Sequence, residues 1–132
     1  MLKTIRNQLK TDIKATNEFQ TVDKYRGEFE EGSEWNPTAT ACFLQVIGYK
    51  PRVKAADGNV IKSIVLIRIY AGALGKYDRD ALDGAEYIYN LLDGHTLESG
   101  NEQWRMSISD EGMDLIYSEK GFEAYAFTVI IS

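Results

Sequence analysis

The sequence predicts an α+β fold in which two helices pack on a mainly antiparallel, mixed β-sheet. Two segments place apolar residues at helical spacing, and the runs between them are rich in β-branched and aromatic residues. Short turns separate these runs, so the strands are expected to form a long hairpin and a C-terminal three-stranded meander. A chain of 132 residues has the length of one domain, so residues 1–132 are expected to form a single unit.

The first predicted element is an amphipathic helix. Leu2, Ile5, Leu9 and Ile13 follow one another at spacings of three and four residues, which places them on one helical face. A helix this short needs a sheet or another partner to pack against. The following segment, 16–36, matches neither periodicity and is expected to be extended or irregular.

A long β-hairpin is expected next. Residues 41–49 are rich in aromatic and β-branched side chains, and Pro51 either ends this strand or places it at a sheet edge. Asp57 and Gly58 form a strong turn signal, and residues 61–70 predict the second strand. Because that strand is apolar on both faces, it is expected to be central or covered on both sides.

A segment of small residues and a second helix follow. Residues 71–75 are alanine, glycine and leucine, and they are expected to form a flexible loop. Residues 78–93 predict a helix with Asp78 or Asp80 as its N-cap. Gly94 suits the position just beyond the helix C-terminus.

The last third of the chain predicts three strands, at 104–109, 113–117 and 122–131. Turn signals at 110–112 and 119–121 separate them, so consecutive strands are expected to pair as a meander. The last strand is apolar on both faces toward its end and is expected to be central in the sheet.

Charge and composition exclude several classes of function. The net charge is −5, and the basic residues are scattered, with one weak group at Lys50, Arg52 and Lys54, so a general polyanion binder is disfavoured. The single cysteine, Cys42, excludes an internal disulfide and a cysteine-based zinc cluster within one chain, and its place beside Phe43 predicts a buried, inert thiol. No apolar run approaches the about 18 residues of a membrane span, and no signal-peptide pattern is present, so a soluble, intracellular protein without membrane contact is expected.

An acidic group at the start of the second predicted helix resembles a calcium-binding loop. Its members are Asp78, Asp80, Asp83, Gly84 and Glu86. A calcium loop that starts at Asp78 needs an oxygen ligand at its fifth position and glycine at its sixth, but Leu82 and Asp83 stand there. The group is therefore interpreted as an acidic first helical turn, which the helix dipole favours.

A glycine-rich segment resembles part of a phosphate-binding loop. Gly72, Gly75 and Lys76 are present, but the spacing is too short and Tyr77 stands where the motif needs serine or threonine. The single histidine, His95, has no nucleophile or orienting partner in a recognisable pattern. No catalytic, cofactor-binding or metal-binding residue is predicted, and the chain is not expected to be an enzyme.

The aromatic residues invite comparison with a nucleic-acid or sugar platform. Trp35, Trp104 and eight tyrosines are present, but they lack the interleaved basic residues that nucleic-acid stacking requires. Use in the core or in a protein interface is the favoured interpretation.

The order of these elements, together with four segments, resembles the small tail terminator, or tail completion, proteins of long-tailed bacteriophages. The segments are LKTIRNQLKTDI, VDKYRGEF, ALDGAEYIYNLLDG and GFEAYAFTVIIS. The chain looks most like the Mu-type prophage family of small neck and tail proteins. The resemblance covers most of the chain, and it consists of patterns rather than catalytic signatures.

The resemblance implies a structural virion protein of the tail or neck that is assembled in the cytoplasm of a bacterial host. Such proteins form a ring, usually a homo-hexamer, on the head-proximal end of the tail tube, where they stop tube polymerisation and offer a surface to the head. The implied partners are further copies of the chain, the tail tube protein and a neck or head-completion protein. DNA would pass through the lumen without specific binding, and no cofactor is implied. The predicted interface residues lie at the hairpin tip and in the loop before the second helix: Asp57, Gly58, Gly72, Leu74, Lys76 and Tyr77.

Three alternatives remain open at this point. A head–tail adaptor or connector of the neck shares the size and charge of a terminator. A host α+β module that binds a small ligand or a protein would need a pocket with convergent polar groups. A metal-dependent hydrolase would use the carboxylates of residues 78–86.

Overall fold

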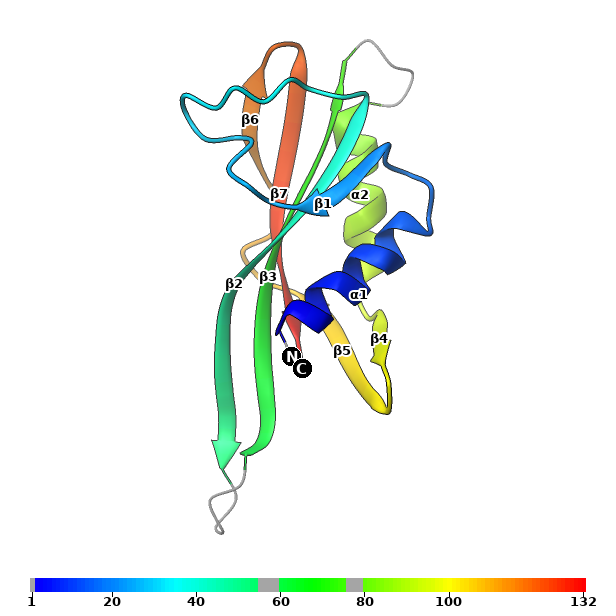
Figure 1. Cartoon of the computed structure of the whole chain (residues 1–132), viewed down its shortest axis with the longest axis vertical. Coiled ribbons are helices and arrows are strands. Elements are labelled where there is room, and N and C mark those ends of the chain that lie inside the picture. The colour runs from blue at the N-terminus through cyan, green and yellow to red at the C-terminus, as the bar shows by residue number, and fades with distance from the viewer. Residues whose placement is uncertain (1, 55–59, 76–79) are drawn as a thin grey trace.

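The computed structural model describes residues 2–54, 60–75 and 80–132. Within them the chain forms two helices and seven strands (Figure 1). The elements are α1 (Leu2–Lys14), β1 (Thr21–Lys24), β2 (Thr40–Lys54), β3 (Val60–Leu74), α2 (Ala81–Leu92), β4 (Thr96–Ser99), β5 (Glu102–Ile108), β6 (Asp114–Glu119) and β7 (Phe122–Ile131). The predicted α+β class is confirmed.

The strands form one curled sheet in the order β1-β2-β3-β7-β5-β4, and β6 also pairs with β7. All described pairs are antiparallel except β1 with β2, so the sheet is mixed, as the sequence predicts. The strands expected at 61–70 and 122–131 are the central strands β3 and β7. Each of these strands pairs with a neighbour on both edges, so the central position expected from their two apolar faces is confirmed.

The expected meander is only partly correct. β6 pairs with β7, but β5 does not pair with β6; β5 and β6 follow one another along the same edge of β7, with Met106 opposite Ile131 and Asp114 opposite Ala126. β5 and β6 therefore run in the same direction, and the turn at 110–112 does not reverse the chain. Both strands lie on one edge of β7 because β3 occupies its other edge. β4 was not predicted, since its four residues, TLES, carry no recognisable pattern.

The prediction of a loop at 71–75 is wrong for most of these residues, because β3 continues to Leu74. Gly72 lies opposite Ala124 of β7, and a Cβ added there would lie 2.5 Å from the Phe122 ring and 2.9 Å from the Ala124 Cα. The small residues thus allow close packing inside the sheet. Composition alone does not distinguish this role from loop flexibility.

The second helix begins at Ala81, later than the sequence predicts, and Asp80 is its N-cap. The Asp80 carboxylate accepts a hydrogen bond from the Asp83 backbone N–H at 2.8 Å, so the acidic first turn is confirmed for the described residues. Gly94 follows the helix with φ +81°, the left-handed conformation expected of a residue at that position.

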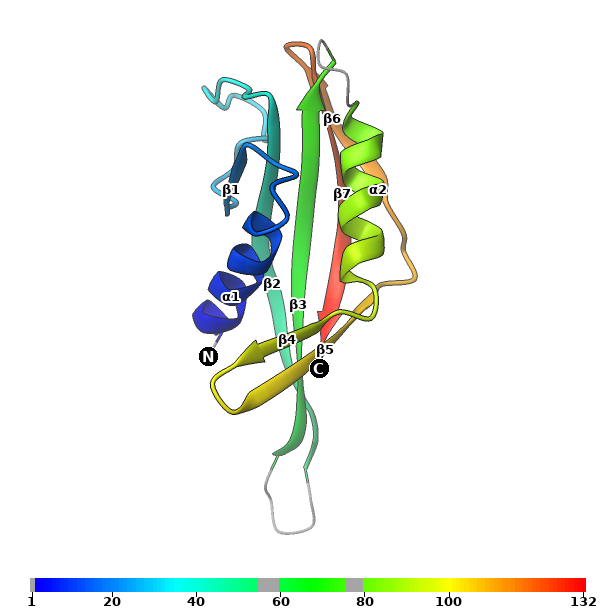
Figure 2. The ribbon, with the colours of Figure 1, turned by 90° about the vertical axis from the view of Figure 1, so that its right-hand side faces the viewer.

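Both helices pack on the same face of the sheet (Figure 2). α1 lies over β1 and β2 and also contacts β4, whereas α2 lies over β3 and β7. α1 buries Ile5, Leu9 and Ile13, the residues that the helical spacing predicts. α2 buries residues including Ala85, Ile88 and Leu92 against the same core.

The opposite face is covered near one end of the sheet by the irregular segment 25–37. Its aromatic residues, Tyr25, Phe29 and Trp35, pack on Phe43 and Phe122 of the sheet. In this region the chain itself therefore covers the second face of the sheet. The sequence does not predict this packing, because the aromatic residues of 25–37 are irregularly spaced and their partners lie in distant segments of the chain.

β2 and β3 extend beyond their neighbours as a two-stranded projection (Figure 1). β1 pairs with β2 only as far as Leu44, and β7 pairs with β3 only from Val65 onward. We call residues 47–54 and 60–64 the arm. Pro51 does not end β2, but β2 is an edge strand there, so the second of the two predicted outcomes is correct.

Candidate interaction surfaces

The structure separates the predicted interface residues. Asp57, Gly58, Lys76 and Tyr77 lie outside the described residues. Gly72 is buried within β3, and Leu74 is partly buried against the aromatic cluster on the sheet. These two residues do not belong to an exposed loop, and their role in an interface stays a prediction.

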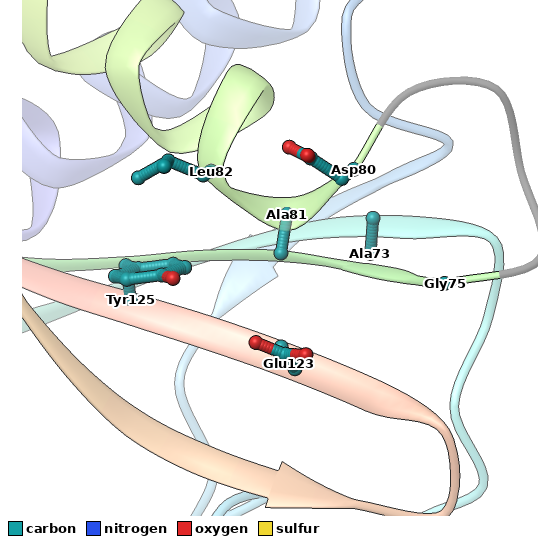
Figure 3. A pocket seen from close by; sticks show the side chains of 7 residues that line it. All are labelled: Ala73, Gly75, Asp80, Ala81, Leu82, Glu123 and Tyr125. Atoms are coloured by element: carbon teal, nitrogen blue, oxygen red, sulfur yellow. The ribbon is translucent and has the colours of Figure 1, made fainter.

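A small pocket lies between the N-terminus of α2 and the ends of β3 and β7 (Figure 3). Its volume is about 180 Å³, below the roughly 300–1,000 Å³ typical of ligand sites. Its lining residues are Ala73, Gly75, Asp80, Ala81, Leu82, Glu123 and Tyr125. One carboxylate oxygen of Asp80 accepts the hydrogen bond that caps the helix, so this side chain has a structural role at the pocket.

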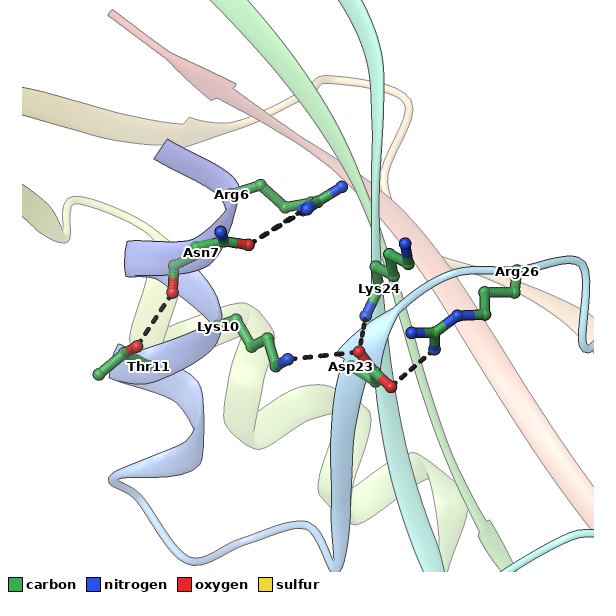
Figure 4. A network of polar contacts seen from close by, with 7 residues as sticks. All are labelled: Arg6, Asn7, Lys10, Thr11, Asp23, Lys24 and Arg26. Carbon is green, nitrogen blue, oxygen red and sulfur yellow. Dashed lines mark hydrogen bonds and ion pairs between the residues drawn. The ribbon is translucent and has the colours of Figure 1, made fainter. Parts of the chain in front are cut away.

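A network of charged side chains ties α1 to β1 (Figure 4). Asp23 accepts hydrogen bonds from Arg26 Nη1 at 2.6 Å and from Lys10 Nζ at 3.3 Å, and the Lys24 backbone N–H also donates to it. The Arg26 guanidinium is the main cause that lowers the pKa of Asp23 to about 2. Since every partner belongs to α1 or to the chain around β1, the network holds the helix against the edge of the sheet.

His95 pairs with Asp12 across two distant parts of the chain. The His95 Nε2 and Asp12 Oδ2 atoms lie 3.1 Å apart, and Gln8 of the same helix donates to the other Asp12 oxygen. This pair joins α1 to the segment after α2, so His95 has a structural role in holding these two parts of the chain together. Cys42 is fully buried, and burial raises the pKa of its thiol, so the inert thiol that the sequence predicts is confirmed.

The aromatic cluster on the face opposite the helices is a packed layer. Tyr25 stacks on Tyr70 with ring centroids 4.2 Å apart, and the Tyr70 hydroxyl donates to Gln45 at 2.8 Å. Burial raises the pKa values of Tyr25 and Tyr70. Trp35 meets Phe122 edge to face, so for these aromatic residues the predicted use in the core is confirmed.

The arm presents exposed apolar side chains on an edge strand. Ile47 is 47% exposed and Tyr49 is 43% exposed, and Lys50 beside them is also exposed. At the far end of the molecule, β6 pairs only with β7 among the described strands, and Leu115 on it is 49% exposed. These two edges are the most pronounced candidate surfaces in the described part of the chain. The sequence predicts the hairpin but not its unpaired edges.

Comparison with known proteins finds no matching family model and no matching curated protein. In the described part of the chain, no helix has the length and apolar character needed to cross a membrane. No group of three or more histidine, cysteine or acidic residues within 2–54, 60–75 and 80–132 is placed to hold a metal ion.

Proposed function

We propose that this chain is a structural protein of a bacteriophage tail. It caps the head-proximal end of the tail tube as a ring of identical copies, ends tube polymerisation and offers the surface to which the head or neck attaches. Its partners are the tail tube protein, a neck or head-completion protein and further copies of itself, and DNA passes through the lumen. In this role the protein works by assembly and is not an enzyme.

The observation that carries the proposal is the placement of exposed strand edges at both ends of an elongated subunit. Such edges pair readily with other chains, because each presents a row of unpaired backbone N–H and C=O groups. A subunit that must join neighbours in a ring and also cap a tube needs several such surfaces.

Two further observations support the proposal. Three of the four segments on which the resemblance rests coincide with α1, α2 and β7, and the fourth, residues 22–29, runs from β1 into the irregular segment 25–37 that covers the sheet. The net charge of −5 suits a channel that DNA traverses without being gripped, since acidic surfaces repel phosphate.

The proposal is tested by deleting the gene from the prophage that carries it, inducing the lysogen and imaging the particles by negative-stain electron microscopy. Overlong tail tubes without heads would establish length termination. Tails of normal length detached from normal heads would favour a head–tail adaptor instead. Intact, infectious phage would refute both roles. Complementation with the wild-type gene controls for effects on neighbouring genes.

A further inference from the structure

The arm leaves the sheet with two unpaired strand edges. Beyond Leu44, β2 has no second neighbour among the described strands, and before Val65 the same holds for β3. A two-stranded hairpin alone is marginally stable in water. The exposed Ile47 and Tyr49 add apolar surface to this edge, so the arm has the properties of a segment that docks on another surface.

The arm differs in charge from the rest of the chain. Residues 47–54 and 60–64 include four basic residues and no acidic residue, a net charge of +4, and since the whole chain carries −5 the remainder carries −9. Its basic residues are Lys50, Arg52, Lys54 and Lys62. An acidic partner surface therefore complements the arm.

The edge strand β6 has the complementary properties. The sequence from 110 to 123 contains five acidic residues and one basic residue, a net charge of −4, and Asp114 and Glu119 at the two ends of β6 are exposed. Leu115 between them offers exposed apolar surface, and one edge of β6 is unpaired among the described strands. β6 thus matches the arm in its free backbone edge, its exposed apolar side chain and its opposite charge.

The arm and β6 lie at opposite ends of the molecule, so the arm cannot reach the β6 strand of its own chain (Figure 1). We propose that the arm of one copy pairs with the β6 edge of a second copy and extends that copy's sheet. Backbone hydrogen bonds would supply affinity and the charges would supply specificity. Arm–arm and β6–β6 pairing are both disfavoured, because each would place like charges together.

This contact joins two different surfaces of identical chains, so it is heterologous. Such a contact repeats from copy to copy and closes into a ring where the rotation permits. The inference deepens the proposed function and rests on it for the architecture of the assembly. The contact itself can be measured with the purified chain alone.

Charge reversal tests the pairing. We expect the wild-type chain to self-associate in size-exclusion chromatography with light scattering, and we expect Lys50→Glu and Asp114→Lys each to weaken association about fivefold, as for inversion of one exposed ion pair. The double variant, which restores opposite charges, should recover most of the loss. Lys24→Glu, an equal change of charge at an exposed residue of β1, should leave association unchanged.

Cysteine cross-linking tests the contact by geometry. Chains carrying Tyr49→Cys mixed with chains carrying Leu115→Cys should form a covalent dimer on mild oxidation, because the native Cys42 is buried and does not compete. Tyr49→Cys mixed with Leu82→Cys, another exposed position that lies on α2, should not.

The outcomes separate the two claims. A wild-type chain that stays monomeric, or one that assembles without response to either charge variant and without the cross-link, overturns the arm–β6 pairing. In the second case the ring and the proposed function stand. If the charge variants and the cross-link behave as expected but the deleted gene leaves phage intact, the pairing stands and the tail function fails.

Discussion

Replacement of Gly72 by alanine should destabilise the protein by about 2 kcal/mol. The added Cβ would lie against the Glu123 carbonyl oxygen, 2.5 Å from the Phe122 ring and 2.9 Å from the Ala124 Cα, and two of these neighbours are backbone that cannot rotate away. Overpacking of a dense site costs about 1–3 kcal/mol. Alanine also lowers the conformational entropy of the unfolded chain, which offsets about 0.4–1 kcal/mol of this loss of stability. Because the obstacle is backbone, the upper part of the overpacking range applies.

Gly75→Ala is the matched control, three residues further along the chain. Among the described residues, a Cβ there would meet only the Gly121 carbonyl oxygen, at 3.9 Å, which is an ordinary contact. Urea unfolding, monitored by tryptophan fluorescence, gives the free energy of unfolding of both variants. If Gly72→Ala proves as stable as Gly75→Ala, then β3 does not pack on β7 as described, and the flexible loop that the sequence predicts would be the better description.

Three further variants test other parts of the fold. Phe29→Ala should cost about 2–3 kcal/mol and shift the fluorescence of Trp35, because a partly exposed ring loses less than the about 3–5 kcal/mol of a buried phenylalanine. Asp80→Ala should cost about 1 kcal/mol through loss of the N-cap, whereas Asp80→Asn should be nearly neutral. Asp23→Asn should cost about 0.5–1 kcal/mol at neutral pH, since solvent screens this half-exposed network. The folded pKa of Asp23, about 2, lies below the unfolded value of 3.8, so this stabilisation is present above pH 4 and is lost as the pH falls toward 2.

Each of these predictions is checked by urea unfolding, with the Asp23 pair compared at pH 6 and again near pH 2. An unchanged Trp35 signal in Phe29→Ala would show that the segment 25–37 does not cover the sheet. Equal losses in the alanine and asparagine variants of Asp80 would contradict the cap. A difference between wild type and Asp23→Asn that stays constant down to pH 2 would contradict the electrostatic role of Asp23.

The sequence predicts those parts of the fold whose signal is local. Ile5, Leu9 and Ile13 mark the buried face of α1 because helical spacing places them together, and doubly apolar runs mark the central strands. The sequence predicts a loop where β3 ends, because small residues are typical both of loops and of close strand packing. Which of the two applies depends on Phe122, which lies about 50 residues away along the chain and whose contact no local pattern reveals.

The candidate surfaces, the arm and the edge of β6, are likewise predicted only where the signal is local. The hairpin was predicted from a turn signal between two apolar runs, but its unpaired edges depend on where β1 and β7 stop. That is a property of strand order, which sequence patterns do not specify. The broken alternation in β6 has a similar origin. Residues two apart in a regular strand share a face, but a register shift between Leu115 and Tyr117 leaves Leu115 exposed while Ile116 and Tyr117 pack on the aromatic cluster.

Stability and assembly should be separable at the arm, because the arm lies beyond the part of the sheet that both helices and the segment 25–37 cover. Where both helices and the segment 25–37 cover the sheet, side chains such as Phe43 and Ile67 are almost fully buried, and substitutions there act on unfolding. Among the described strands the arm has neighbours on neither edge, so Lys50→Glu should leave the free energy of unfolding of the monomer within about 0.5 kcal/mol of wild type. A variant that lost both assembly and monomer stability at Lys50 would mean that the arm packs on its own chain, and the pairing with β6 of another copy would then lose its physical basis.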